Sequence, residues 1–421
     1  MANIPKDVIF IWPGNHADIP TGWERVTALD GKYPKGAADG VNPNVTGGSS
    51  THQHTGTTHS HTDSHTHTIT ISACSTSLGN VDTGGGSSYS GRAHTHTATC
   101  GAVSGGSLSS VSCTYDSVSN DPPYYSVIFI TPTSNISSLP NLAVYLYEGT
   151  DSRTGHYICD GNNSTPNLAN KYLKGAAAGA NAGGTGGSTT NVHTLTHTHT
   201  VASHGHASTT SSTPSATGGG TGSDGNKCSS ASHTHTINVN SATSSISSTA
   251  PSLTTTETVE PAYTKLLAVQ NRTGHGDARV GMIGMWLGTL ASIPSNYELT
   301  STNMKGRHLK LTATASEIGN TGGSNTHTHA SQSHTHTASE THTHTHPNLT
   351  HTTAGEDNSS KGFNPNKKDE SHTVTVSSST SVYSDAATSA DEQSNEPEYR
   401  TVAFIKLKSL SGGGAFLLNM I

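Results

Sequence analysis

Residues 325–347, "NTHTHASQSHTHTASETHTHTHP", alternate histidine with threonine and then repeat that alternation twice more. In an extended strand, residues i and i+2 face the same side, so each His-x-His pair presents both imidazoles in one direction. Threonine fills most intervening positions, and its branched Cβ suits an extended backbone. The pattern therefore predicts a strand with an imidazole-lined inner face and threonines facing outward.

The same pattern occurs three times, within three tandem copies of one unit. Each copy opens on an apolar run with a glycine turn: "DVIFIWPGN", "LAVYLYEGT" and "MIGMWLGTL". It passes through "GKYPKGA", "NKYLKGA" or "GRHLKLT" to a Gly-Gly pair and closes on "PPYYSVIFI", "EPAYTKLLAV" or "EPEYRTVAFI". We align the closing segments on Tyr125, Tyr263 and Tyr399. The predicted repeats are residues 1–137, 138–277 and 278–410, followed by a Gly-linked apolar tail at 411–421.

Composition favours an all-β fold with an unusual distribution of apolar residues. Hydrophobic residues make up 30% of the chain and aromatics 5%, which is low for a globular domain. Charged residues are only 12%, so the chain also lacks the composition of a solvated disordered protein. The apolar runs are short, rich in Val, Ile and aromatics, and confined to the two ends of each copy. Each copy is therefore expected to form a small β base and a long polar excursion without a core.

Several function classes are disfavoured. The net charge of −7, with no basic block, argues against a nucleic-acid partner. No apolar run approaches the length of a membrane span, and the first apolar stretch is too short, and too soon broken by Pro13, for a signal peptide. The five cysteines lack metal-site spacing; buried single thiols are favoured over a local bridge between Cys100 and Cys113.

Aligned on the Gly-Gly pairs, 22 of the 28 histidines fall into four rows. The first row contains His52, His54, His193, His327 and His329, with Asn191 at the sixth position. The second row contains His59, His61, His197, His199, His334 and His336. The third row contains His65, His67, His204, His206, His342 and His344. The fourth row contains His94, His96, His233, His235 and His372, with Val374 at the sixth position.

Three strands around one axis, each with two imidazoles, would supply an octahedral shell of six ligands. Zinc favours four ligands and Cu(II) a tetragonal field, so this pattern indicates Fe(II) or, second, Ni(II) or Co(II). Metal–ligand bonds would replace the missing core, as structural zinc sites do with about 10 kcal/mol in small domains. Because only neutral imidazole binds, we expect metal loss as the pH falls well below about 6.5.

Three other interpretations fit the histidine pattern less well. A disordered, metal-sequestering tract has no reason to keep one register in three copies. A flat ice-binding face would not require histidine at alternate positions. A catalytic metal needs an open coordination position and a nearby base, whereas the second and third rows are closed by six histidines. We interpret Asn191 and Val374 as tolerated degeneracy, with either a water or a vacancy at the sixth position of those rows, and we do not expect an enzyme.

Gly-Gly followed by His-x-His pairs and a "PPYY" strand resembles the collar and needle tip of bacteriophage tail fibres. Residues 157–176, "YICDGNNSTPNLANKYLKGA", are similar to the phage tail collar domain, and the flanking copies carry eroded versions. In that family, three identical chains form a needle whose axial His-x-His pairs hold iron, and the distal end binds the host. The resemblance therefore implies iron at the histidine rows and a bacterial surface glycan or protein receptor.

This chain already contains three copies, so it is expected to be an elongated, monomeric single-chain pseudotrimer. Three collar-like β bases would carry an intertwined three-stranded needle stapled by metal. The loops 77–93, 214–230 and 354–371 would form the tip. Candidate receptor-binding residues there are Tyr89, Arg92, Lys227, Lys361, Phe363, Lys367 and Lys368.

The expected location is an extracellular virion tail, with residues 411–421 docking on other tail proteins or folding back on the base. The alternative function is a structural subunit of an extracellular filament or spike without a receptor role. A hydrolytic metalloprotein is a third possibility.

Overall fold

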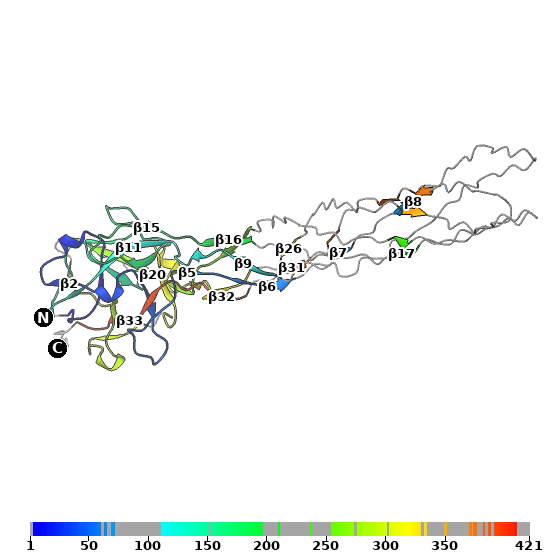
Figure 1. Ribbon diagram of the computed structural model, residues 1–421. Helices are drawn as coiled ribbons and strands as arrows, with labels where there is room; N and C mark the ends of the chain where they lie inside the picture. Colours follow the sequence, from blue (N-terminus) through cyan, green and yellow to red (C-terminus); the bar gives the residue numbers. More distant parts are fainter. Residues whose placement is uncertain are drawn as a thin grey trace, which may run out of the picture.

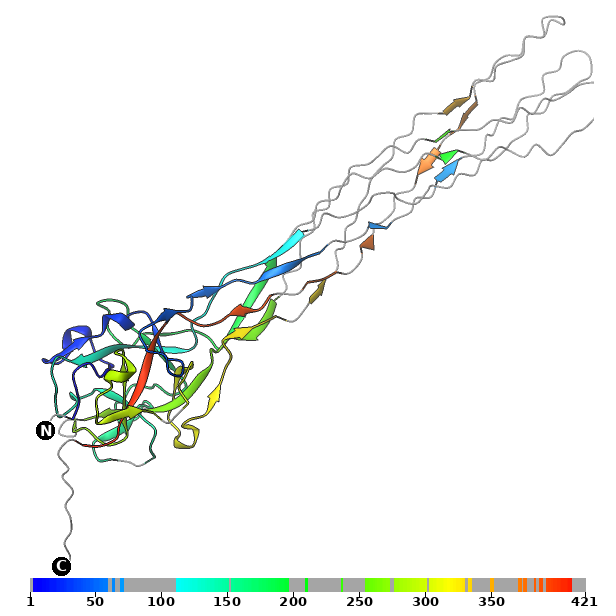
Figure 2. The same cartoon turned by 90° about the horizontal axis from the view of Figure 1, so that it is seen from below.

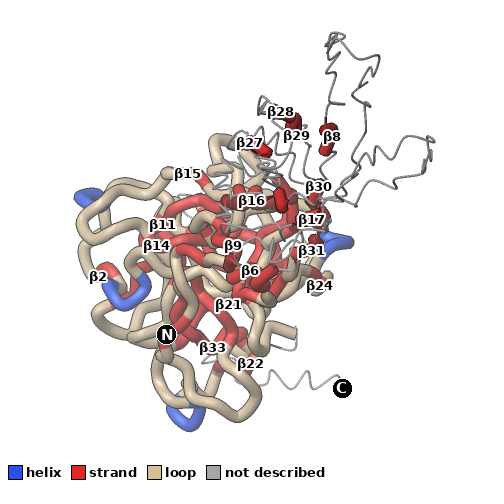
Figure 3. The backbone as a smooth tube through the Cα atoms, turned by 45° about the vertical axis from the view of Figure 1, so that its right-hand side comes forward, coloured by secondary structure: helices blue, strands red, loops and turns tan. Residues whose placement is uncertain are grey.

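The computed structural model describes residues 3–59, 63–64, 69–71, 111–150, 153–196, 209–210, 236–237, 254–272, 276–300, 303–329, 332–334, 349–351, 370–372, 374–376, 382–383, 386–388 and 391–410. Within these ranges the chain is all-β, as predicted. Its helices are four single 3-10 turns at the periphery of the base (Figure 3): η1 (His16–Asp18), η2 (Thr27–Leu29), η3 (Leu290–Ser292) and η4 (Ala315–Glu317). None of the described helices has the length and hydropathy needed to cross a bilayer.

The base is one 15-stranded sheet to which each predicted repeat contributes five strands. Repeat 1 contributes β1 (Phe10–Trp12), β2 (Trp23–Arg25), β3 (Tyr33–Gly36), β4 (Thr46–Gly47) and β11 (Tyr124–Pro132). Repeat 2 contributes β12 (Val144–Tyr147), β13 (His156–Ile158), β14 (Tyr172–Gly175), β15 (Thr185–Gly186) and β20 (Tyr263–Asn271). Repeat 3 contributes β21 (Met282–Trp286), β22 (Tyr297–Leu299), β23 (His308–Thr312), β24 (Thr321–Gly322) and β33 (Tyr399–Leu407).

Strand pairing between repeats is cyclic. The middle strand of each repeat runs parallel to the closing strand of another repeat: β3 with β33, β14 with β11 and β23 with β20. The short Gly-Gly strands follow the same order, with β4 on β33, β15 on β11 and β24 on β20. The opening strands also meet, through the β1–β12 and β12–β21 pairings and the bridge between Ile9 and Met285. Each repeat therefore completes the sheet of its neighbours.

The register corrects one detail of the sequence alignment. Gly186 lies opposite Tyr124, just as Gly322 lies opposite Tyr263 and Gly47 opposite Tyr399. Tyr124 is therefore the equivalent of the other two closing tyrosines, and aligning Tyr125 with them was wrong by one residue. The two adjacent tyrosines of "PPYY" made the sequence ambiguous, and a shift of one residue moves a side chain to the opposite face.

Each closing tyrosine also supports an ion pair between repeats. Lys174 Nζ lies 2.6 Å from Asp121 Oδ2, Lys310 Nζ lies 2.6 Å from Glu260 Oε1, and Lys35 pairs in the same way with Glu396. The three ammonium groups lie over the rings of Tyr124, Tyr263 and Tyr399 at 4.8, 4.5 and 4.3 Å. Because all three pairs are partly shielded from solvent, they contribute more than exposed pairs would.

The core of the base is shared by the three repeats. Alternate residues of the closing strands, including Val127, Leu266 and Val402, point into one buried cluster. The opening strands complete it with Ile11, Leu146 and Ile283 among others, all at most 1% exposed. A second buried cluster lies on the other face of these strands. Burial of apolar surface is the main stabilising contribution to folding, so a single repeat would lose most of that contribution.

Glycine is required where the chain leaves the base. The second residue of each Gly-Gly pair has a positive φ: 74° at Gly48, 75° at Gly187 and 68° at Gly323. A Cβ at these positions would lie 2.0, 2.0 and 2.3 Å from a proline carbonyl oxygen of the closing segment. Only glycine accommodates both that conformation and that approach. The turns direct the next residues of all three repeats away from the base.

Beyond the turns, short strands continue away from the base along one direction, with β9, β7 and β8 successively further out (Figures 1 and 2). We call this part the stem. Repeat 1 provides β5 (Thr51–His52), β6 (Thr55–His59), β7 (Asp63–Ser64), β8 (Ile69–Ile71), β9 (Val111–Tyr115) and β10 (Val118–Ser119). Repeat 2 provides β16 (Thr190–Thr196), β17 (Thr209–Thr210), β18 (Thr236–Ile237) and β19 (Thr254–Thr258). Repeat 3 provides β25 (Thr326–His327), β26 (Gln332–His334), β27 (Leu349–His351), β28 (Glu370–His372), β29 (Val374–Val376), β30 (Val382–Tyr383), β31 (Ala386–Thr388) and β32 (Gln393–Ser394).

Near the base, each outgoing strand of the stem pairs antiparallel with the return strand of its own repeat: β6 with β9, β16 with β19 and β25 with β32. Strands of different repeats also pair: β16 with β9, β29 with β8 and β30 with β7. The expected three-stranded needle is therefore built, in its described part, from outgoing and returning strands together. The return strands satisfy backbone groups that a narrow bundle of three strands would leave exposed.

Candidate metal centre

Five histidines of the first row converge at the root of the stem. Along repeat 1 the side chains alternate, with Thr51 and Gln53 exposed and His52 and His54 buried, as the strand pattern predicts. The fractional exposures are 7% for His52, 1% for His54, 0% for His193 and 4% for His329. His327 is half-buried. The three repeats thus contribute imidazoles to one enclosed volume.

The ligand atoms of four of these side chains lie within 4.8 Å of one another: those of His52, His54, His193 and His327. The closest approaches are between Nε2 atoms, at 3.1 Å from His52 to His193 and 3.0 Å from His54 to His327. The ring of His329 lies against the same group, with centroids 4.4 Å from His54 and 4.7 Å from His193. These residues form a buried cluster that could hold a metal ion.

The outer nitrogens of three rings have oxygen partners. His52 Nδ1 lies 2.6 Å from Asn120 Oδ1, and His193 Nδ1 lies 3.0 Å from the carbonyl oxygen of Asp116. His54 Nδ1 lies 2.7 Å from the carbonyl oxygen of Asp391. Since these oxygens only accept hydrogen bonds, each Nδ1 carries the proton. In a neutral ring the opposite nitrogen, Nε2, then presents a lone pair.

The pair formed by His52 and His193 indicates what kind of ligand this cluster can bind. Both rings donate from Nδ1, so two Nε2 lone pairs face each other across 3.1 Å. Two acceptors at that distance repel unless a cation or a proton lies between them. The orientation of Asn120 is fixed independently, because its Nδ2 donates to the carbonyl oxygen of Ser49 at 3.0 Å. The donor set therefore fits a metal ion that accepts nitrogen ligands.

Protonation is the other way to relieve that repulsion, and the surroundings oppose it. Burial, with added repulsion from neighbouring imidazoles, lowers the pKa of His52 to about 4, of His327 to about 3 and of His329 to about 4. Burial also lowers the pKa of His193 from its ordinary value of 6.5. At neutral pH these rings are therefore uncharged, the form in which imidazole binds metals.

The Nε2 spacing bears on coordination geometry. With metal–nitrogen bonds of about 2.1 Å, adjacent ligand atoms lie about 3.0 Å apart in an octahedron and about 3.4 Å apart in a tetrahedron. The two Nε2 separations of 3.1 and 3.0 Å agree with the octahedral value. The two separations are thus compatible with a single metal ion bound between the rings.

The remaining sequence-predicted ligands are less completely described. His59, His334 and His372 lie on the described backbone of the stem, on β6, β26 and β28. Fourteen others lie outside the described residues: His61, His65, His67, His94, His96, His197, His199, His204, His206, His233, His235, His336, His342 and His344. The seven receptor-binding candidates, Tyr89, Arg92, Lys227, Lys361, Phe363, Lys367 and Lys368, and the tail at 411–421 also lie outside the described residues.

Sequence reasoning missed the residues that orient the ring nitrogens. Asp116 and Asp391 occupy equivalent places on the return strands of repeats 1 and 3, four residues before Asn120 and Asn395. Their carboxylates lie 3.5 and 3.6 Å from Nδ1 of His193 and His54. Aligning "DSVSND" with "DEQSNE" reveals this shared pattern, so the signal was present in the return strands. Such outer partners fix ring orientation in metal sites.

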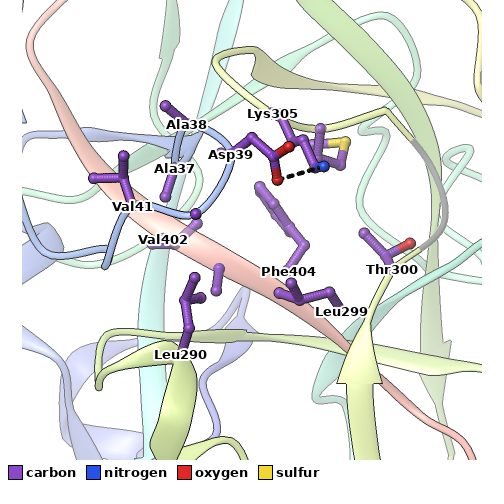
Figure 4. Close-up of a pocket in the computed structure, with 14 residues that line it drawn as sticks. Ala37, Ala38, Asp39, Val41, Leu290, Leu299, Thr300, Lys305, Val402 and Phe404 are labelled. Carbon is purple, nitrogen blue, oxygen red and sulfur yellow. Dashed lines mark ion pairs between the residues drawn. The ribbon is translucent and has the colours of Figure 1, made fainter.

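Three features of the base lie apart from this cluster. His308, left outside the rows, is fully buried and occupies the position of Tyr33 and Tyr172 in the other repeats, with its Nε2 3.7 Å from Glu396 Oε1. A shallow cavity of about 50 Å³ is lined mainly by apolar side chains, with the exposed ion pair between Asp39 and Lys305 beside it (Figure 4). No histidine lines that cavity. Cys159 is a buried free thiol, as expected for a cysteine that packs as an apolar group.

Comparison of the chain with protein-family models, with curated proteins and with solved structures returns no match.

Proposed function

We propose that this chain is a phage tail fibre or tail-tip adhesin whose stem is held together by iron ions and whose distal loops recognise a bacterial surface. The observation that supports the metal-bound stem most strongly is the contact between His52 and His193, which come from different repeats. Their Nε2 atoms face each other at 3.1 Å, each with a lone pair. A metal bound there would link different repeats where they enter the stem. Its role is structural, and no catalytic role is proposed.

Iron is proposed because the spacing of the five rings suits octahedral coordination and because the chain resembles tail fibre tips. Nickel and cobalt share the preference for this geometry, and zinc fits it less well. Element analysis of protein purified without a histidine tag tests this directly. We expect several iron ions per chain; zinc alone, or no metal after growth in iron-supplied medium, would contradict it.

The adhesin role assigns receptor contact to the loops 77–93, 214–230 and 354–371. Its test is binding of labelled protein to whole bacteria from a panel of strains and to their purified lipopolysaccharide. Replacing Lys361, Lys367 and Lys368 together with alanine should reduce binding to the strain that is recognised. A matched control removes three exposed lysines of the base, Lys6, Lys305 and Lys408, and should leave binding unchanged.

A structural subunit of a filament or spike is the competing role. Electron microscopy of the full chain and of a chain ending at Leu410 separates the two. Filaments formed by the full chain and lost on truncation would favour the structural role, whereas single particles that bind bacteria favour the adhesin.

A further inference from the structure

The five histidine rings are arranged as five vertices of an octahedron. Eight ring pairs have centroids 4.4–5.2 Å apart and interplanar angles of 68–88°, and these separations are those of adjacent ligands. The rings of His193 and His327 are instead 6.5 Å apart and nearly parallel, as opposite ligands would be. His54 has all four other rings as close neighbours. The vertex opposite His54 is therefore the one that no histidine supplies.

Asn191 belongs at that sixth vertex. It lies four residues after the second glycine of its Gly-Gly pair, as His52 and His327 do in the other repeats. It also precedes the buried His193 by two residues on β16, so both side chains project from the same face of the strand. The repeats thus place an amide where the octahedron requires an imidazole.

The amide of Asn191 is engaged elsewhere. Its Nδ2 donates to the carbonyl oxygen of Ser119 at 2.7 Å, and its side chain is shorter than that of histidine. Repeat 2 also lacks the residue that holds the outer ring nitrogen at this vertex in repeat 1. Asn120 accepts from His52, whereas its counterpart in repeat 2 is the apolar Val259. The counterpart in repeat 3 is Asn395, which is buried but makes no hydrogen bond to the His327 ring. Repeat 2 therefore differs from repeat 1 at both the ligand and the supporting residue.

We propose that the metal centre at the root of the stem binds a small exogenous ligand at the vertex opposite His54. This inference rests on the proposed metal binding and adds a ligand-exchange site to it. In the absence of such a ligand, water would occupy the vertex. Asn191, which stands at the sequence position of the missing histidine, would offer its Oδ1 as a hydrogen-bond acceptor to that water. A diatomic molecule or small anion with a nitrogen or oxygen lone pair would displace it.

Access is expected from the side of Asn191. The rings of His54 and His193 are 1% and 0% exposed, which closes the opposite side. Asn191 itself is half-buried, and the adjacent Val192 is 46% exposed at the outer surface of β16. The side of Asn191 is therefore the one from which we expect a small ligand to enter.

The test uses nitric oxide added without oxygen to the full chain loaded with Fe(II). The nitrosyl complex of ferrous iron is counted by electron paramagnetic resonance, and total iron is measured on the same samples. Asn191→His should close the vertex, removing one nitrosyl per chain while iron content is retained. Asn191→Ala should keep the nitrosyl, and Val192→His, which adds a histidine on the outer face one residue away, should also keep it.

The outcomes separate this inference from the metal proposal. Wild-type protein that binds no iron overturns the metal proposal itself. Protein that binds iron but gives no nitrosyl, or gives the same number of nitrosyls after Asn191→His, overturns the ligand-exchange site and leaves the metal proposal standing. Loss of the nitrosyl in Asn191→His but not in Val192→His supports it.

Discussion

At the scale of single residues, the outer nitrogen of each imidazole matters as much as the inner one. Asn120, Asp116 and Asp391 accept from Nδ1 and so turn Nε2 of His52, His193 and His54 toward a common centre. These contacts join repeat 1 to repeats 2 and 3, because the partners of His193 and His54 lie on neighbouring repeats. These contacts therefore hold the rings in the orientation that a bound metal ion requires.

Asn120→Ala should weaken metal binding at the first row about 10–100-fold, because it removes the acceptor that fixes the His52 ring. Competition with a chelator of known affinity, followed by element analysis, measures this effect. Asn162→Ala, which alters an exposed asparagine of the base, is the control. Equal affinity in the two variants would mean that the His52 ring is held by other contacts.

Acid should destabilise the metal-free protein between about pH 6.5 and about pH 4. The pKa values of His52 and His329 are lowered to about 4, so in that interval the unfolded chain binds protons that the folded chain does not. Stability therefore rises with pH across the interval and falls as the pH is lowered through it. Thermal unfolding of chelator-treated protein from pH 7.5 to 4 measures this. A melting temperature that stays flat there, or rises toward acid, would contradict the buried neutral cluster.

At the scale of elements, the Gly-Gly turns set the register of the histidine rows. Each turn has a positive φ and lies close to a proline carbonyl of the closing segment. The strand that follows therefore starts at the equivalent position in every repeat. This is why aligning the sequences on Gly-Gly brought His52, His193 and His327 into one row, and why the structure gathers them. The order in which strands of different repeats pair side by side could not be predicted in the same way. The pairing of each middle strand with another repeat's closing strand depends on long-range contacts that no local pattern specifies.

The cost of losing such a turn can be separated into backbone strain and steric clash. Gly187→Ala combines a φ of 75° with a Cβ that would lie 2.0 Å from the carbonyl oxygen of Pro122. Gly179→Ala has a similar φ of 72° but no atom within 4 Å of its Cβ. We expect about 1–2 kcal/mol of destabilisation for Gly179→Ala, from strain alone, and a clearly larger loss for Gly187→Ala. Denaturant unfolding measures both, and equal losses would show that the turn relaxes to accept a side chain.

At the scale of the whole molecule, the three repeats form one folding unit. Their closing strands, ion pairs and buried clusters are all shared, so no repeat has a complete core of its own. The all-β class could be predicted from the sequence because the short apolar runs are local signals, and the recurring Gly-Gly pairs made it possible to align the histidine rows. The return strands beside each outgoing strand, and the partners of the ring nitrogens, could not be assigned until the pairing between repeats was known.

Removing one repeat should therefore abolish folding of the others rather than leave a smaller folded protein. A chain of residues 138–410 lacks β1, β3 and β11, which leaves β33 without β3 and β14 without β11. We expect no cooperative thermal transition and low dispersion of amide resonances for this fragment, whereas the full chain should elute with the mass of one 43.3 kDa chain. A cooperatively folded two-repeat fragment would contradict the shared core.

If three segments of one polypeptide enclose a metal ion between His52, His54, His193, His327 and His329, the ion should be visible in crystals of the protein. The experiment is anomalous diffraction recorded on both sides of the iron absorption edge. We predict an iron-specific peak at the centre of these five rings, about 2.1–2.2 Å from each inner nitrogen. Five rings turned apart, or density between them without an anomalous signal from any metal, would contradict it.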